Sequence, residues 1–371
     1  MGVSEHAVIA SKVPKWLKGN ELPFSEFMRR ALYEPELGYY SRARSPVGTG
    51  GDFVTSPALS PVFSFALNRL VREFLERGND EVSQIVDVGC GDGALIHSLF
   101  DAARGAWADA EFLGVDQSLD RVVPESAPQL RFVRSLDDLR TSRRLTIANE
   151  LFDALPFGRL VMRTDGLHEL YVRERKGAID WTEHPAGARY ESYLSERSIV
   201  LEVGQFADIS LEWSELYELL AQRTPTGLIV TLDYGMRQEK LFRSRMRRYG
   251  TAAAYRGHRV SRDLLASPGE QDLTAHVNFS DLEAAGVRNG FETLFFDSQA
   301  KFLLALGVTE HELFVPLEET SLPPEQAIEL LDARDRARQL VLPDGIGEEI
   351  RVLVQGKGVT GASWSFQRRL F

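Results

Sequence analysis

The chain has 371 residues, more than one average domain, and its 43% hydrophobic content is ample for a buried core. Its 54 acidic and 43 basic side chains give a formal net charge of −11 and form no long basic run, so nucleic acid is not expected as the main partner, because phosphate neutralisation needs clustered Lys and Arg. No apolar run reaches the ~18 residues that a membrane-spanning helix needs.

Cysteine content and the N-terminal residues bear on the cellular location. The single cysteine, Cys90, excludes an intramolecular disulfide and favours a reducing compartment. Residues 1–24 contain neither an apolar signal core nor an Arg-rich transit pattern. We therefore expect a cytoplasmic protein of bacterial type without membrane insertion or a metal site, and the oligomeric state is left open.

Helical patterns dominate residues 1–80. One amphipathic helix is predicted just after Pro23, and another begins at Ser60, a hydroxyl N-cap followed by proline. Between them, residues 48–57 read GTGGDFVTSP, in which dense glycines beside Asp52 indicate either a loop close to a ligand or an ordinary surface turn. This helical N-terminal segment is placed to cover a cofactor site.

The central stretch of the sequence is QIVDVGCGDGA, residues 84–94. An apolar run with an acid near its end is typical of a buried strand in an α/β sheet, and a helix pattern follows the three glycines. Glycine is needed on such a turn because a ligand lying against the backbone leaves no room for Cβ. Gly89, Gly91 and Gly93 are therefore predicted to form a nucleotide-type binding loop at a helix N-terminus.

The nature of the nucleotide depends on the residues around this loop. A second apolar strand pattern ends in Asp116, about two dozen residues beyond the glycines, where a carboxylate is expected to bind a ribose diol. The loop also satisfies a dinucleotide pattern, so an NAD enzyme with His276 as hydride-transfer acid stays open. Asp87 before the first glycine instead gives D-x-G-x-G-x-G, which resembles methyltransferase motif I and favours S-adenosyl-L-methionine (SAM).

Further strand patterns extend the predicted sheet to about seven strands; they lie at residues 111–116, 130–135, 145–150, 226–235, 291–299 and 350–355. In open α/β sheets, ligands bind beyond the carboxyl ends of the strands. Asn149, Glu150 and Asp153 follow the fourth strand and are expected to point into the same crevice as the glycines. Asp233 and Tyr234 end the fifth strand and are expected there too.

The predicted core is interrupted once. Residues 81–157 form its first half, and residues 158–197 are a β insertion, because two β-rich runs flank a tight turn. Residues 198–371 form the second half of the core, with C-terminal helices. Residues 198–204 are expected to return to the core, with Glu202 near the end of this stretch. Residues 236–262 are predicted to be an irregular, lid-like connection.

Two smaller features of this second half have more than one interpretation. Residues 243–248, RSRMRR, are the longest basic cluster, which is either a solvated helix face or a site for a local anionic partner. Asp272, Thr274 and His276 alternate before a predicted helix, and His276 is either structural or part of a substrate site.

Several blocks of the sequence together resemble one known family. They are YEPELGYY, GGDFVTSP, DVGCGDGAL, NELFDALP, LDYG and DLTAHVNF, in the order and approximate spacing of the MidA-like family of SAM-dependent methyltransferases. That family is related to the mitochondrial protein arginine methyltransferase that assists respiratory complex I assembly. The resemblance covers residues 20–307 and implies an α/β, Rossmann-like, seven-stranded class I methyltransferase fold with a helical N-terminal segment and a small β insertion.

The resemblance implies a SAM-dependent enzyme that methylates an arginine of a protein substrate, such as a respiratory complex subunit. A carboxylate orients a guanidinium best, so Glu150 and Asp153 are the predicted catalytic residues. The predicted cofactor-binding residues are Asp52, Asp87, Gly89, Gly91, Gly93, Asp116 and Asn149. The predicted substrate-binding residues are Glu202, Asp233, Tyr234 and His276.

Two alternatives within this family stay open. The helical N-terminal segment and the β insertion could enclose a small-molecule acceptor as readily as admit a protein loop. An assembly chaperone that binds SAM without catalysis would also retain the glycines and carboxylates, as structural anchors.

Overall fold

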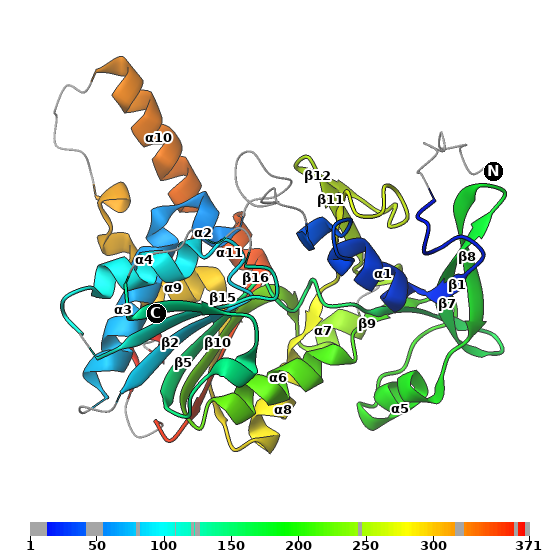
Figure 1. Cartoon of the computed structure of the whole chain (residues 1–371), viewed down its shortest axis with the longest axis horizontal. Helices are drawn as coiled ribbons and strands as arrows, with labels where there is room; N and C mark the ends of the chain where they lie inside the picture. The colour runs from blue at the N-terminus through cyan, green and yellow to red at the C-terminus, as the bar shows by residue number, and fades with distance from the viewer. Residues whose placement is uncertain are drawn as a thin grey trace.

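The structure is a computed structural model, and it describes residues 13–41, 55–78, 82–107, 109–119, 122, 127–243, 247–315, 323–359 and 363–367 (Figure 1). Its central sheet has the strand order β15-β16-β10-β5-β2-β3-β4, with the short β14 beside β10. The strands are β2 (Ser83–Val88), β3 (Glu111–Val115), β4 (Leu130–Val133), β5 (Arg143–Asn149), β10 (Thr226–Met236), β14 (Val277–Asn278), β15 (Glu292–Ser298) and β16 (Ile350–Lys357).

The five strands from β4 to β10 pair in parallel, whereas β16 runs antiparallel to both of its neighbours. All seven predicted strands are present, so the predicted α/β class is confirmed, and the short β14 is one strand more than predicted. Every residue of β2 is buried, as expected for a parallel strand covered on both faces.

Two layers of helices cover this sheet and form two hydrophobic cores. Helices α3 (Pro61–Glu76), α4 (Ala94–Ala103) and α9 (Gln299–Ala305) pack on one face, and α6 (Glu212–Arg223) and α8 (Phe279–Arg288) pack on the other. Successive strand residues alternate between the cores, since Ile85 lies in the first and Val86 in the second. Pro61 begins α3 after Ser60, as predicted. Helices α10 (Pro324–Gln339) and α11 (Ile346–Glu349) precede β16.

A second sheet contains the predicted insertion and extends beyond it. Its strands are β1 (Glu21–Pro23), β6 (Gly158–Arg163), β7 (Gly166–Arg175), β8 (Ala178–Pro185) and β9 (Phe206–Ile209), followed or flanked by α5 (Ala188–Glu196). Strand β9 pairs with β6, and β1 pairs with β7, so residues on both sides of the predicted insertion belong to this sheet. The expected return to the core before Glu202 is wrong, because this stretch contains no strand.

The N-terminal helix α1 (Phe24–Tyr33) packs against this second sheet and carries its own small core. A 3₁₀ turn at Tyr39–Ser41 and the short α2 (Ser56–Leu59) follow. The other 3₁₀ turns span Leu136–Asp138, Val308–Glu310, Glu312–Phe314 and Ser365–Gln367. Among the described helices, none has the length and apolar character to cross a membrane.

The expectation of an irregular connection over residues 236–262 is wrong. Helix α7 (Gln238–Arg243) and two strands of a third sheet, β11 (Ala253–Arg256) and β12 (Arg259–Ser261), lie in this region, and the third strand of that sheet, β13 (Asp272–Thr274), follows it. The buried carboxylate of Asp208 on β9 accepts hydrogen bonds from the backbone N–H groups of Thr251 (2.6 Å) and Ala252 (2.8 Å), which fixes the start of the third sheet. This long-range contact leaves no local sequence signal.

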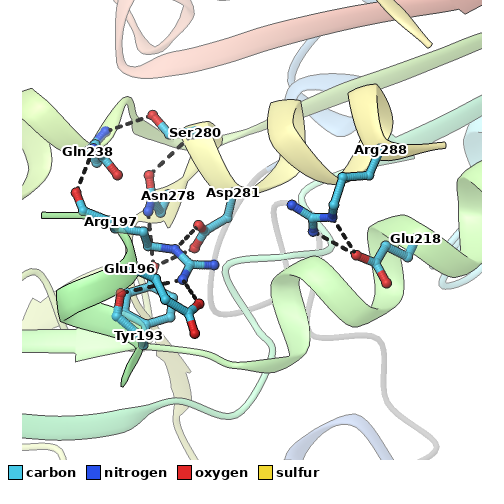
Figure 2. A network of polar contacts seen from close by, with 9 residues as sticks. All are labelled: Tyr193, Glu196, Arg197, Glu218, Gln238, Asn278, Ser280, Asp281 and Arg288. Atoms are coloured by element: carbon cyan, nitrogen blue, oxygen red, sulfur yellow. Dashed lines mark hydrogen bonds and ion pairs between the residues drawn. The ribbon is translucent and has the colours of Figure 1, made fainter. Parts of the chain in front are cut away.

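A buried polar joint connects the insertion to the core (Figure 2). Arg197, just after α5, and Tyr193 both bond to the carboxylate of Asp281 on α8, and Asn278 donates to the Tyr193 hydroxyl at 3.0 Å. The side chains of Arg197 and Asp281 are 22% and 4% exposed. An exposed pair in the same view, Arg288 on α8 and Glu218 on α6, joins two helices of the core at 2.6 Å.

Candidate active site

A cavity of about 1620 Å³ lies beyond the carboxyl ends of the core strands. One end is bounded by the glycine turn after β2 and by the residues after β3 and β4. The other end lies between α1, the loop after β5, the end of β10 and the third sheet. The cavity therefore joins the predicted cofactor loop to a region assembled from several distant segments.

Gly91 presents bare backbone to this cavity. Its φ is +58°, and a Cβ at this position would meet no atom within 4 Å, so a side chain would enter the ligand space. Gly89 and Gly93 also have positive φ, but a Cβ there would approach Leu151 and Phe132, respectively, to 2.8 Å. Gly89 lines the cavity, whereas Gly93 serves the packing of the turn.

Two carboxylates support the turn. Asp116 accepts hydrogen bonds from the backbone N–H groups of Gly91 (3.0 Å) and Ser118 (2.8 Å), so it fixes the loop and also lines the cavity. Asp87 is buried beneath the turn, and burial, followed by the charge of Asp116, raises its pKa to about 7. Burial also raises the pKa of the Cys90 thiol, which keeps it protonated and inert.

These residues fit a cofactor with a polar amino-acid end and a ribose. Asn149 lines the cavity, and its buried Oδ1 atom has no hydrogen-bond partner among the described residues. An orphaned acceptor of this kind is suited to an amino group of a ligand. Of the residues expected on the cofactor side, Asp87, Gly89, Gly91, Asp116 and Asn149 line the cavity, whereas Gly93 does not and Asp52 lies outside the described residues.

The loop after β5 carries Glu150 and Asp153 on a tightly held backbone. Glu150 has φ +51°, an uncommon conformation for a residue other than glycine. Asp233 accepts hydrogen bonds from the N–H groups of Leu151 (3.1 Å) and Phe152 (2.7 Å). The carbonyl groups of residues 152, 153 and 154 accept hydrogen bonds from the Trp213 indole (2.9 Å), the Ala275 N–H (3.1 Å) and the Tyr33 hydroxyl (2.9 Å), respectively. The two acids are therefore held in place before any ligand binds.

Both acids lie in a strongly desolvated environment. Burial raises the pKa of Glu150 to about 7, although hydrogen bonds from the Ser56 N–H (3.1 Å) and the Asn149 amide (3.3 Å) act in the opposite direction. Burial, and next the charge of Asp233, raises the pKa of Asp153 well above its usual range. Within the described residues, neither Glu150 nor Asp153 forms an ion pair with Lys, Arg or His.

Tyrosines and another acid surround Asp153 at this end of the cavity. The Tyr40 hydroxyl donates to the buried Asp272 carboxylate at 2.9 Å, and the rings of Tyr33 and Tyr40 stack with centroids 5.6 Å apart. Burial raises the pKa of Tyr255, with Asp153 and Asp272 as the next causes. Tyr33, Tyr40 and Tyr255 are not among the predicted site residues, although Tyr33 and Tyr40 stand in the YEPELGYY block and Asp272 begins the DLTAHVNF block.

The four predicted substrate residues separate into two groups. Tyr234 and His276 line the cavity, whereas Asp233 and Glu202 do not. Asp233 is fully buried under the loop that it holds, and burial raises its pKa to about 8. Glu202 is exposed on a turn of the insertion. Burial, followed by Arg247 and Arg262, lowers the pKa of His276 to about 4, so its ring is neutral near pH 7.

Comparison with known proteins agrees with this geometry. Residues 68–296 match the model of the family described as "Putative S-adenosyl-L-methionine-dependent methyltransferase". The chain belongs to this family. The protein is thus a SAM-dependent methyltransferase, its expected cofactor is confirmed, and the NAD alternative is wrong.

Relatives of this methyltransferase cover most of its length. A mitochondrial protein arginine methyltransferase NDUFAF7 homolog of Drosophila melanogaster is 28% identical over 74% of this chain and 69% of that protein. The mitochondrial protein arginine methyltransferase NDUFAF7 of Danio rerio is 25% identical over 92% of this chain and 84% of that protein. The crystal structure of a Burkholderia thailandensis protein bound to S-adenosyl-homocysteine has a TM-score of 0.81 at 29% identity and covers 94% of this chain and 91% of that chain.

These relatives correct one expectation. Both of these curated relatives are mitochondrial by name, which contradicts the cytoplasmic location expected from the first residues of this chain.

Proposed function

We propose that the protein transfers the methyl group of SAM to an arginine side chain of a protein substrate, of the kind that a respiratory complex subunit provides. The observation that carries the proposal is the placement of Glu150 and Asp153, two desolvated carboxylates without an ion-pair partner in the described residues, in a cavity continuous with the cofactor turn. Buried uncompensated charge is costly, and a guanidinium would compensate it. The names of the relatives support the same acceptor.

The cofactor supplies a methyl group on a positively charged sulfur, and transfer forms one N–C bond, breaks one C–S bond, leaves the electron pair on sulfur and releases one proton from nitrogen. Glu150 and Asp153 bind the guanidinium and orient one nitrogen towards the cofactor end of the cavity. Burial raises the pKa of Glu150 to about 7 before a guanidinium binds. The positive charge of the guanidinium favours the ionised form, so Glu150 is a carboxylate in the complex and can accept the released proton.

The test uses methyl-tritiated SAM, the purified protein and a soluble and membrane proteome from the source organism. Label recovered as methylarginine after acid hydrolysis of protein, and lost with Glu150→Gln, is the expected result. Calorimetric titration with S-adenosylhomocysteine runs alongside, and Glu150→Gln should bind it as the natural protein does.

Other outcomes contradict the proposal in distinct ways. Label confined to the small-molecule fraction would show that the acceptor is a metabolite. Normal S-adenosylhomocysteine binding with no labelled product of any kind would favour the assembly chaperone without catalysis.

A further inference from the structure

A second, smaller cavity of about 420 Å³ lies outside the catalytic one and is strongly basic. Met236 at the end of β10, residues of α7, Arg247 and one residue of β16 line it. Its charged lining residues are Glu239, Lys240, Arg243, Arg247 and Arg351. Four cations against one carboxylate stand out in a chain whose formal net charge is −11.

Three of the four cations of this basic cavity, the two on α7 and Arg247, have no ion-pair partner in the part of the chain that the structure describes. Within the described residues, no ion pair involves Lys240, Arg243 or Arg247, nor does Glu239 form one. Burial lowers the pKa of Arg247, so its guanidinium is partly desolvated. Neighbouring arginines behave differently, since Arg237 pairs with Glu283 at 2.9 Å.

Arg351 completes the cavity from the sheet. Its register partner on β10 is the buried Asp233, and its charge helps to lower the pKa of Asp297, after the hydrogen bond from Lys301 at 2.9 Å. The Asp297 carboxylate, near the end of β15, is therefore already paired with Lys301 of α9. A partly desolvated set of guanidinium and ammonium groups of this kind is suited to bind carboxylates or phosphates.

The basic cavity adjoins the acceptor end of the catalytic cavity. Arg247 is close enough to His276 to contribute to its lowered pKa, and His276 lines the catalytic cavity. The Gly250 N–H donates to the Arg247 carbonyl at 2.9 Å, and Thr251, which also lines the catalytic cavity, accepts the His276 N–H at 3.1 Å. Four residue steps therefore separate the two cavities along the chain, which is at most about 14 Å.

We propose that the basic cavity binds the carboxylates of an acidic segment of the protein substrate, close to the arginine that enters the catalytic cavity. This inference rests on the proposed function and adds a rule for substrate choice. A separation of at most about 14 Å is spanned by roughly four residues of extended peptide, so acidic residues within about five positions of the arginine reach the cations. The acidic chain disfavours a polynucleotide as the occupant of this cavity.

The test compares two synthetic 12-residue peptides, each with one arginine. One carries Glu and Asp three to five positions from the arginine on both sides, and the other carries Gln and Asn there. The test variant is Lys240→Gln with Arg243→Gln, two exposed side chains whose removal should leave the fold intact. The control is Arg104→Gln with Arg175→Gln, which removes the same charge from exposed positions outside both cavities.

We expect the KM of the acidic peptide to be lower than that of the neutral peptide by roughly 3- to 10-fold, the size given by one or two partly exposed ion pairs. This advantage should vanish in the test variant and persist in the control, with kcat unchanged in both. Equal KM values for the two peptides with the natural protein would overturn the proposal. If the acidic peptide has no advantage, but inorganic phosphate or a single-stranded oligonucleotide competes strongly with peptide binding, the basic cavity binds phosphates and the proposal is wrong.

A binding measurement separates this inference from the proposed function. Fluorescence anisotropy of the labelled acidic peptide, with S-adenosylhomocysteine present, needs no turnover. Tight binding that the test variant loses would support the basic cavity even if neither peptide is methylated, in which case the arginine acceptor alone fails. Methylation of both peptides with equal affinity would retain the arginine acceptor and refute the basic cavity.

Discussion

The two ends of the catalytic cavity are built in different ways. The cofactor end comes from one short turn, residues 87–94, and the strand ends beside it in a parallel sheet. The acceptor end combines the N-terminal helix, the loop after β5 and the third sheet, with the Tyr40 to Asp272 hydrogen bond joining residues 232 positions apart. The difference teaches that cofactor binding depends on local backbone, whereas acceptor binding depends on how separate parts are held together.

The largest effect of a single substitution is expected at the cofactor end of the cavity. Gly91→Val places a side chain in the ligand space, so the affinity for S-adenosylhomocysteine, measured by calorimetry, should fall by roughly 100-fold or more. Gly105→Val is the matched control, because Gly105 also has positive φ (+83°) and open surroundings but lies outside the cavity. Both variants should lose about 1–2 kcal/mol of stability from backbone strain. Equal affinity in the two variants would refute the role of the turn.

The next effect concerns Glu150 and its pH dependence. Since burial raises its pKa in the folded protein to about 7 from an ordinary 4.5, the folded state binds the proton more tightly than the unfolded state. The stability that this gives is present below pH 4.5 and is lost as the pH rises to about 7. Glu150→Gln should therefore be more stable than the natural protein at pH 8, by up to about 3 kcal/mol, but not at pH 4.

The same substitution should remove activity while leaving the cofactor end intact. We expect kcat to fall by roughly 10²- to 10⁴-fold, the usual worth of a positioned acid or base. Glu202→Gln, a change at an exposed residue outside the cavity, is the control and should alter neither the melting profile nor kcat. A melting temperature of Glu150→Gln below that of the natural protein at pH 8 would contradict the desolvation argument.

The effect expected at Asp233, which lies beneath the acceptor end, is on stability and not on the chemistry. Asp233→Ala leaves the N–H groups of Leu151 and Phe152 without their acceptor and should cost about 2–4 kcal/mol in chemical denaturation. Asp233→Asn keeps an acceptor oxygen and should recover most of this loss. If Asp233 contacted the substrate directly, Asn would instead keep stability but raise KM as much as Ala does.

The smallest effects separate the joint of the insertion from an ordinary surface pair (Figure 2). Arg197→Gln leaves the buried Asp281 without its cation and should cost about 1–3 kcal/mol, with a raised KM for a peptide acceptor and unchanged S-adenosylhomocysteine affinity. Arg288→Gln removes an exposed partner of Glu218 and should cost less than about 0.5 kcal/mol. Equal losses, measured by thermal and urea unfolding, would show that burial does not distinguish these pairs.

The sequence predicted the parts of the molecule that carry local signals. Apolar runs and the glycine turn gave the seven strands, and Ser60 with Pro61 gave the start of α3. The direction of side chains at a strand end is harder to predict, because neighbouring side chains on a strand point to opposite sides. Tyr234 lines the cavity, while Asp233 lies beneath the loop after β5. Nothing in the pattern of β10 distinguishes these two directions.

Long-range contacts explain the remaining differences. The hydrogen bonds from the N–H groups of residues 251 and 252 to the Asp208 carboxylate order a region whose composition is typical of irregular structure. Because β9 pairs with β6, residues 198–205 remain beside the second sheet and do not return to the core, and Glu202 lies on an exposed turn. The tyrosines around Asp153 and Asp272 come from segments too distant for any periodicity to join them.

The pairing of β1 with β7 also determines the order in which the chain can mature on the ribosome. Glu21 pairs with Arg173, so about 150 residues must be synthesised before the first strand finds its partner, which takes roughly 10 to 30 seconds at ordinary elongation rates. During that interval the apolar face of α1, with Phe24, Phe27 and Met28, has no sheet to cover it. A nascent chain halted before β7 should therefore recruit chaperones, and release of its N-terminal helix from them would mark the completion of the second sheet.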